Sequence, residues 1–257
     1  MISKPELDIL TPRIPGLPDN VRAFMTLRAG GVSSGPFGDA SGIGGMNVGA
    51  YVEDFEACVR TNRAMVADFA GARPLWLKQV HGTGVVFAEE AQNECVADAA
   101  IATTPGVACV VQTADCLPIL LARKDGRAVA AVHASWTCLA KGVVGATFAK
   151  LSERFEGGEY LAWIGPHIRL EDFEIGEDVL EFFEDRGRDV RGYAKIEGPV
   201  MKLDLTAIAV DQLREAGLAP GDIHDARLST YADSDRFFSY RRDGKTGRHA
   251  TLIWMTK

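Results

Sequence analysis

Three short segments of this chain carry two histidines and one cysteine that could together hold a metal ion. They are QVHG, ADCLP and VHASW, which contain His81, Cys116 and His133. Two imidazoles and one thiolate suit zinc, and three protein ligands leave one coordination position open, as in catalytic zinc sites. Copper accepts the same nitrogen and sulfur donors, and we expect zinc rather than copper.

The same residues also fit a chemistry without metal. Cys116 could be the nucleophile of a Cys–His hydrolase, with His133 or His81 as its base. Asp115 directly precedes Cys116 and could serve as a general acid or base, orient a ligand imidazole or simply form a turn. We count all four residues as catalytic candidates.

A cluster of cations lies in the turn-rich segment FFSYRRDGKTGR, residues 237–248. Arginine forks suit phosphate or carboxylate groups, whereas a solvated hairpin with scattered charge is the alternative. The two adjacent arginines and the aromatic residues favour substrate binding. Arg241 is the residue of this segment that we expect to bind substrate.

Short apolar runs predict the strands that must position these side chains. The first three span residues 107–111, 117–121 and 128–132, and Asp125-Gly126 between the last two is typical of a hairpin turn. Cys116 and His133 would then be close together, whereas only tertiary folding can add His81.

The remaining pattern predicts a mixed fold of strands and helices. A hairpin pair excludes a purely parallel sheet. We therefore expect one α+β domain over residues 1–257, with a mixed β-sheet covered by helices. The other predicted elements are helices at 53–70, 139–155, 174–186 and 204–217, strands at 160–164 and 250–255, and a Gly- and Ser-rich loop at 28–49 that borders the site.

Composition limits the class of protein. Of 257 residues, 47% are hydrophobic and 25% charged, which suffices for a sizeable core, and the formal net charge of −7 argues against nucleic-acid binding. No segment resembles a signal sequence or a membrane span. Five cysteines, an odd number, fit a reducing compartment. We expect a cytoplasmic protein that acts on a small molecule, and the oligomeric state stays open.

Together, the motifs resemble the family long named laccase-type multicopper polyphenol oxidases, since described as zinc-dependent purine nucleoside phosphorylases with adenosine deaminase activity. The resemblance runs from about residue 22 to the end of the chain. It rests on ordered segments: RAGGVS, NVG, QVHG, TADCLP, VHASW, IGPHI with FEIG after it, and FFSYRRDG with TGR.

The resemblance implies a three-layer α+β sandwich and a metal held by His81, Cys116 and His133. It also implies phosphorolysis of adenosine, inosine, guanosine or methylthioadenosine, and hydrolytic deamination of adenosine. Arg28, Asn47 and Arg241 would bind the nucleoside and phosphate. Some bacterial members are described instead as editing factors for peptidoglycan precursors, which a metal-free Cys–His hydrolase could serve.

Counting histidines excludes true laccase chemistry. A multicopper oxidase ligates four coppers, largely through imidazoles, and this chain has five scattered histidines. A single His₂Cys copper site would carry electrons instead.

The chain departs from the family beside His133. Ser135, Thr137 and Cys138 stand where the family usually has Gly, Arg and Gly. The first change replaces a residue that tolerates positive φ, and the second removes a natural partner for phosphate. We expect metal binding to survive, phosphorolysis to suffer most and deamination to suffer less. A catalytically silent binding homologue is the other reading of these changes.

Overall fold

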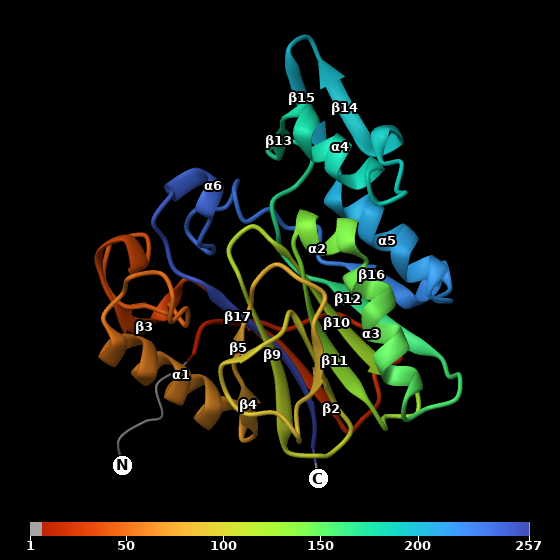
Figure 1. Ribbon diagram of the computed structural model, residues 1–257. Coiled ribbons are helices and arrows are strands. Elements are labelled where there is room, and N and C mark those ends of the chain that lie inside the picture. Colours follow the sequence, from red (N-terminus) through yellow and green to blue (C-terminus); the bar gives the residue numbers. More distant parts are fainter. Residues whose placement is uncertain (1–6, 257) are drawn as a thin grey trace, which may run out of the picture.

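The computed structural model describes residues 7–256, and two large β-sheets form its centre (Figure 1). Five strands make the first sheet, in the order β1-β2-β17-β9-β4. β4 lies parallel to β9, and the other neighbours are antiparallel. The strands are β1 (Ile9–Leu10), β2 (Val21–Thr26), β17 (His249–Met255), β9 (Val107–Thr113) and β4 (Arg73–Leu75).

The second sheet has six strands in the order β16-β12-β10-β11-β8-β6. β10 pairs antiparallel with β11 and β12, whereas the edge strands β16 and β6 run parallel to their neighbours. The strands are β16 (Ile223–Asp225), β12 (Tyr160–Ile164), β10 (Leu117–Arg123), β11 (Val129–Ala134), β8 (Ala99–Ala102) and β6 (Val85–Phe87).

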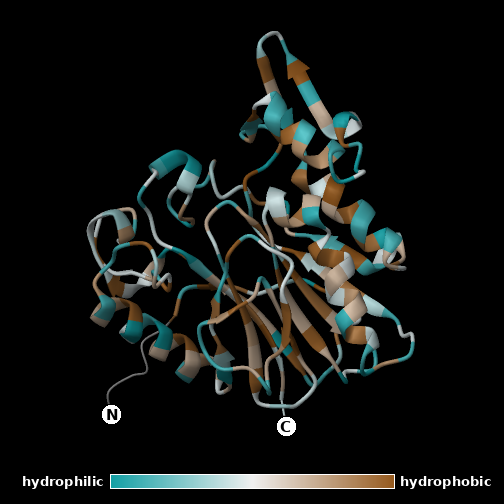
Figure 2. Ribbon diagram, viewed as in Figure 1, coloured by the Kyte–Doolittle hydropathy of each residue, from teal (hydrophilic) through white to brown (hydrophobic). Residues whose placement is uncertain are grey.

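The two sheets pack face to face through a shared apolar layer. Cys109, Val111 and Ile253 of the first sheet belong to the same buried cluster as Leu120 and Trp163 of the second. Burial on both faces explains why these strands are continuous apolar runs rather than alternating ones. Figure 2 shows hydrophobic residues concentrated along these strands.

Helices cover both outer faces. α1 (Glu56–Ala70) packs on the first sheet, where its Val66 joins Phe24, Val110 and Leu252. The second sheet is covered by α2 (Trp136–Lys141), α3 (Val143–Ser152), α4 (Glu177–Glu184) and α5 (Leu205–Glu215). The predicted α+β class with mixed sheet under helices is confirmed, and its central layer is a double sheet.

Smaller elements complete the chain. A sheet in the order β13-β15-β14 projects beyond α4 in Figure 1, and β5 pairs with β7. The remaining bounds are β3 (Ala29–Ser33), η1 (Gly35–Phe37), β5 (Leu77–Lys78), β7 (Cys95–Val96), β13 (Glu174–Ile175), η2 (Arg191–Tyr193), β14 (Ala194–Glu197), β15 (Val200–Leu203), η3 (Pro220–Asp222) and α6 (Tyr240–Asp243).

Two sequence predictions need correction. The helix predicted at 139–155 begins earlier and is divided at Gly142, whose φ of 86° breaks the helical backbone between α2 and α3. The Gly-rich stretch 28–49 is not all loop, because β3 and η1 lie within it. Its end, Gly49, does border the pocket described below.

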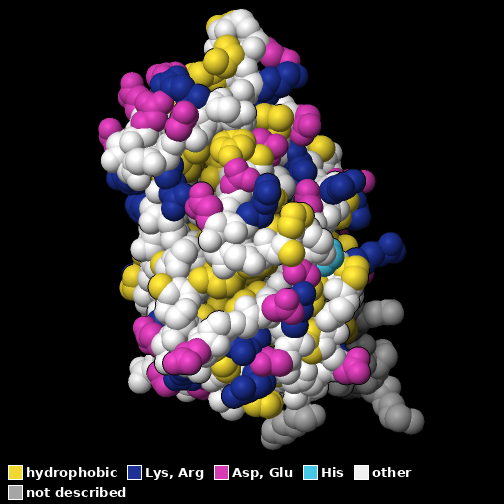
Figure 3. All heavy atoms as spheres, turned by 90° about the vertical axis from the view of Figure 1, so that its right-hand side faces the viewer, with side chains coloured by type: hydrophobic (Ala, Val, Ile, Leu, Met, Phe, Trp, Pro, Cys, Tyr) yellow, Lys and Arg dark blue, Asp and Glu magenta, His cyan; other side chains and the backbone are white. Residues whose placement is uncertain are grey.

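The surface charge and the character of the helices are also relevant to function. Figure 3 shows both signs of charge interspersed over the face that α3 and α5 form at the right of Figure 1. Within residues 7–256, none of the helices combines the length and apolar character needed to cross a bilayer.

Candidate metal centre and pocket

His81, Cys116 and His133 meet at one place in the fold. One potential ligand atom of each lies within 4.8 Å of the others. Cys116 lies in the short connection from β9 to β10, His133 in β11, and His81 in the loop after β5. The antiparallel register pairs Leu117 with Ala134, so the predicted proximity of Cys116 and His133 is confirmed.

A buried carboxylate, Asp98, orients His133. The Nδ1 atom of His133 lies 2.8 Å from Oδ1 of Asp98, and both side chains are buried. With Nδ1 occupied in this way, Nε2 is the nitrogen left for the cluster. This is the arrangement in which a carboxylate fixes the tautomer of a metal-bound histidine.

Asp98 also holds the loop that carries His81. Its carboxylate accepts hydrogen bonds from the backbone N–H groups of Val80, His81 and Gly82, at 3.3, 3.0 and 2.7 Å. These bonds stabilise His81 at a φ of 56°, which is uncommon for a residue other than glycine. Asp98 was missed from the sequence, where its one signal is an acid directly before the apolar run of β8.

The pKa values of the two histidines in the cluster are shifted in opposite directions. Partial desolvation and the neighbouring His133 lower the pKa of His81 to about 4, so this imidazole is neutral at pH 7. Burial by itself would lower the pKa of His133, but Cys116 and Asp98 outweigh burial and hold that pKa well above its ordinary value. Without a metal, Cys116 and Asp98 therefore favour the protonated form of His133.

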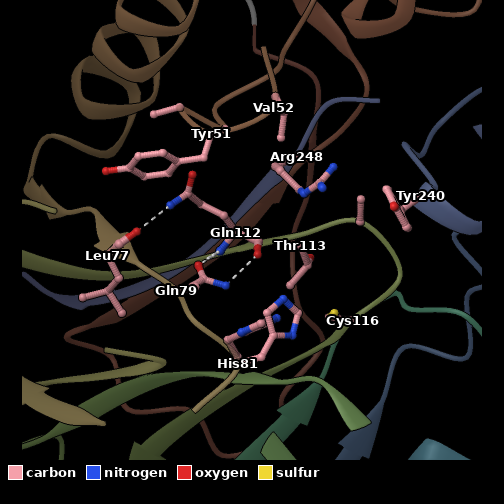
Figure 4. A pocket seen from close by; sticks show the side chains of 14 residues that line it. Tyr51, Val52, Leu77, Gln79, His81, Gln112, Thr113, Cys116, Tyr240 and Arg248 are labelled. Carbon is pink, nitrogen blue, oxygen red and sulfur yellow. Dashed lines mark hydrogen bonds between the residues drawn. The ribbon is translucent and has the colours of Figure 1, made fainter. Parts of the chain in front are cut away.

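The cluster forms part of the wall of a pocket of about 470 Å³ (Figure 4). This volume lies within the range of small-molecule sites. Tyr51 and Tyr240 add aromatic surface to the wall. Gln79 and Gln112 also line it, and their amides hold the strands together: Gln79 bonds both the N–H and the C=O of Gln112 at 2.7 and 2.9 Å.

Arg248 is the cation that the structure places in the pocket wall. It lies in the cation-rich segment predicted from sequence, at its last residue rather than at Arg241. Its backbone N–H donates to Oδ1 of Asn47 at 2.8 Å. Burial lowers the pKa of Arg248, although Cys116 and Asp115 oppose this.

The three predicted substrate-binding residues do not line this pocket. Asn47 is fully buried behind the pocket lining, and its Oδ1 accepts hydrogen bonds from the backbone N–H groups of Gly49 and Arg248. Arg28 donates to the carbonyls of Gly38 and Ser234, and Arg241 donates to the carbonyl of Glu174. Asn47 thus positions wall residues, and the two arginines connect loops.

Asp115 faces away from the histidines. Its carboxylate accepts hydrogen bonds from Thr230 Oγ1 at 2.6 Å, Ser239 Oγ at 3.0 Å and the backbone N–H of Arg241 at 2.7 Å. These contacts tie the Cys116 loop to the segment before α6. Of the roles open to Asp115, the structure favours the turn, and the carboxylate that orients an imidazole is Asp98.

The departures from the family pattern fit without strain. Ser135 has a φ of −64° and caps α2 by accepting from the N–H of Cys138 at 3.2 Å, so the concern about positive φ was wrong. Cys138 is fully buried and belongs to a second group of donors with Asp98 and His133. Thr137 places no cation near the cluster.

The donor set fits a metal ion. Two nitrogens and one sulfur converge from separate elements, and the nitrogen of His133 is preset by Asp98. Thiolate and imidazole are ligands for zinc or copper. His81 lies exposed at the pocket side of the group, while Cys116 is half-buried and His133 buried, so a ligand from the pocket can reach the group.

Comparison with known proteins identifies the family of this chain. Residues 22–256 match the family model described as multi-copper polyphenol oxidoreductase laccase. The purine nucleoside phosphorylase PA4543 of Pseudomonas aeruginosa is 39% identical over 248 residues, which cover 96% of this chain and 98% of that protein. The purine nucleoside phosphorylase YfiH of Escherichia coli is 36% identical over 252 residues, with 96% and 98% covered.

Solved structures show the same fold. Protein NMB0706 of Neisseria meningitidis superposes with a TM-score of 0.88 at 38% identity, covering 97% of this chain and 100% of that one. YlmD of Geobacillus stearothermophilus gives a TM-score of 0.86 at 25% identity, with 97% of each chain covered. Sequence, fold and the full length of the match agree: the chain belongs to the laccase-like polyphenol oxidoreductase family, whose relatives here are named purine nucleoside phosphorylases.

Proposed function

We propose that this protein is a zinc-dependent purine nucleoside enzyme that cleaves nucleosides with phosphate and deaminates adenosine with water. The observation that supports it best is the His81–Cys116–His133 group on the wall of a pocket of nucleoside-compatible volume. The names of the relatives point to the same substrates.

Zinc would be held by His81, Cys116 and His133, where it would supply Lewis acidity and activate water near neutral pH. Binding requires a neutral imidazole and a thiolate. His81 is already neutral at pH 7. Cys116 and Asp98 raise the pKa of His133, so zinc would have to displace a proton to bind this imidazole. Asp98 keeps Nδ1 of His133 engaged throughout.

The two reactions place different demands on the pocket. In phosphorolysis a phosphate oxygen bonds to the anomeric carbon of the ribose, the bond to the purine nitrogen breaks, and the purine leaves with the electron pair and gains a proton. In deamination water adds to the ring carbon that carries the amine, and ammonia leaves. Tyr51 and Tyr240 offer the aromatic surface on which a purine can stack.

The first test is the metal content of the purified protein beside that of Cys116→Ala. We expect about one zinc per chain in the unaltered protein, measured by elemental mass spectrometry, and a loss of most of it in the variant. Cys58→Ala is a matched control, because Cys58 is a half-buried thiol on α1 and should leave the metal in place.

Activity follows as the second test. The zinc-loaded protein should convert adenosine to inosine in phosphate-free buffer, and added phosphate should release free purine base. A metal-free protein isolated without chelator would contradict the zinc assignment. Bound zinc without turnover in either buffer would favour the silent binding homologue.

A second candidate function rests on one observation. Asp98, His133 and Cys116 stand in the order of an acid, an imidazole and a thiol, and Cys116 and Asp98 raise the pKa of His133. That arrangement suits a metal-free Cys–His hydrolase with Cys116 as nucleophile, for which peptidoglycan precursors are the substrate class. Rapid alkylation of Cys116 by iodoacetamide, unchanged by added zinc, would favour this function.

A further inference from the structure

Arg248 stands in the pocket wall without a carboxylate partner. Among the residues that the structure describes, its Nη1 donates to the carbonyls of Thr246 and Gly247, both at 3.0 Å, and no acidic side chain forms an ion pair with it. Cys116 and Asp115 favour its charged form without a hydrogen bond to it, and a half-buried guanidinium that binds no anion directly is unfavourable. The remaining donors of the fork are open to such an anion.

Thr113 supplies a second unpartnered group in the same wall. Its side chain is 1% exposed, and its Oγ1 has no hydrogen-bond partner within residues 7–256. Thr113 pairs with His249 across β9 and β17, so it lies beside Arg248. In the view of Figure 4, Thr113 lies between Arg248 and the pair His81 and Cys116.

The surrounding backbone is built to hold Arg248 in this place. Oδ1 of the buried Asn47 accepts the N–H groups of both Arg248 and Gly49, at 2.8 and 2.9 Å. A Cβ on Gly49 would come within 2.8 Å of Cγ of Arg248, so the stem of the arginine packs where only glycine leaves room. The hydrogen bond to Asn47 and the packing against Gly49 therefore both fix the position of Arg248.

Within residues 7–256, three other cations near the site are engaged by backbone carbonyls. Arg28 donates to the carbonyl of Gly38, Arg241 to that of Glu174 and Lys141 to that of His81. Among the described residues, Arg248 is the one arginine on the wall. An anion that enters the pocket beside His81 and Cys116 can therefore pair with the guanidinium of Arg248.

We propose that Arg248 and Thr113 form the subsite that binds inorganic phosphate as the second substrate. The guanidinium would take two phosphate oxygens through its fork, and the Thr113 hydroxyl would donate to a third. This inference rests on the proposed function.

Direct binding tests the subsite without relying on turnover. Titration calorimetry of the zinc-loaded protein with inorganic phosphate should show binding, weakened roughly 10- to 100-fold in Arg248→Gln and several-fold in Thr113→Val. Arg248→Lys keeps the charge without the fork and should lie between them. Arg60→Gln, an exposed arginine on α1, is the charge-matched control and should bind as the unaltered protein does.

Kinetics then separate this proposal from the proposed function. Arg248→Gln should raise the KM for phosphate in phosphorolysis by a similar factor, whereas Arg60→Gln should leave this KM unchanged. Circular dichroism and retained zinc would show that the variant is folded. Phosphate binding that depends on Arg248 but leads to no phosphorolysis would support the subsite and contradict the proposed reaction.

Three results would overturn the subsite. One is phosphate affinity unchanged in a folded Arg248→Gln. Another is phosphorolysis that keeps its KM for phosphate in that variant. The third is tight binding of adenosine monophosphate with no binding of inorganic phosphate, which would assign Arg248 to a phosphate carried by the nucleoside itself.

Discussion

At the scale of single residues, Asp98 is the side chain that positions both histidines of the candidate metal centre. One buried carboxylate sets the tautomer of His133 and fixes the backbone of the loop that carries His81. Both histidines therefore depend on a residue outside the proposed ligand set of His81, Cys116 and His133. Asp98 is a positioning residue, and its effect should appear in metal affinity before it appears in activity.

Asp98→Asn is expected to weaken zinc binding by about 10- to 100-fold, as for other carboxylates behind metal ligands. The amide cannot accept hydrogen bonds at its nitrogen, so part of the contacts to Val80, His81 and Gly82 is lost. Competition with a chromogenic chelator measures the affinity.

A control separates this effect from a general loss of stability. Asp225→Asn removes a half-buried carboxylate that pairs with Arg169 away from the pocket, and it should lower stability without changing zinc affinity. Equal zinc affinity in Asp98→Asn and the unaltered protein would contradict the positioning role.

At the scale of elements, the single helix predicted at 139–155 is in fact two helices, α2 and α3, separated at Gly142. Gly142 ends α2 and begins α3 with a φ of 86°. A Cβ at this position would lie 3.3 Å from a guanidinium nitrogen of Arg188.

Gly142→Ala should lower the free energy of unfolding by roughly 1–2 kcal/mol, because an L side chain is strained at positive φ. Gly145→Ala is the matched control three residues on, inside α3, with nothing within 4 Å of a new Cβ. It should be neutral or stabilising by up to about 1 kcal/mol. Urea denaturation of both variants measures the difference, and equal effects would contradict the assigned bend.

At the scale of the whole molecule, two buried histidines make stability depend on pH. Burial lowers the pKa of His249 to about 3 and that of His167 to about 4. Both rings are fully engaged as neutral imidazoles: His249 lies between the carbonyl of Thr26 and the N–H of Phe238, and His167 between Gly165 and Thr206. Protonation of His249 would break the hydrogen bond that Nε2 accepts from the N–H of Phe238.

The sign follows from these depressed values. Above pH 6.5 both states hold neutral histidines, so the stabilisation is present in full. As the pH falls from 6.5 towards 4, the unfolded chain binds protons that the folded chain does not, and stability falls by about 1.4 kcal/mol per pH unit for each histidine. His249→Gln should show a pH slope smaller by about one proton in urea denaturation series. An unchanged slope would contradict the neutral buried ring.

Local patterns in the sequence predicted the parts of the site that local folding builds. The Asp-Gly turn and two flanking apolar runs predicted the β10–β11 hairpin, and with it the approach of Cys116 to His133. The helices at 53–70, 174–186 and 204–217 are confirmed in type, with ends within a few residues. Apolar periodicity carries such information because neighbours in the chain share one element.

Only the tertiary structure decided which polar residues serve the pocket. Arg248 and Asn47 are 201 residues apart in the chain and meet because the N–H of Val48 donates to the carbonyl of Arg248 at 3.1 Å. Asp98 reaches His81 and His133 because β8 lies beside β11. Arg28 and Arg241 carry the same charge as Arg248 but lie outside the wall. Residue type determines which chemistry is available, whereas the long-range pairing of strands determines which of several equivalent residues can perform it.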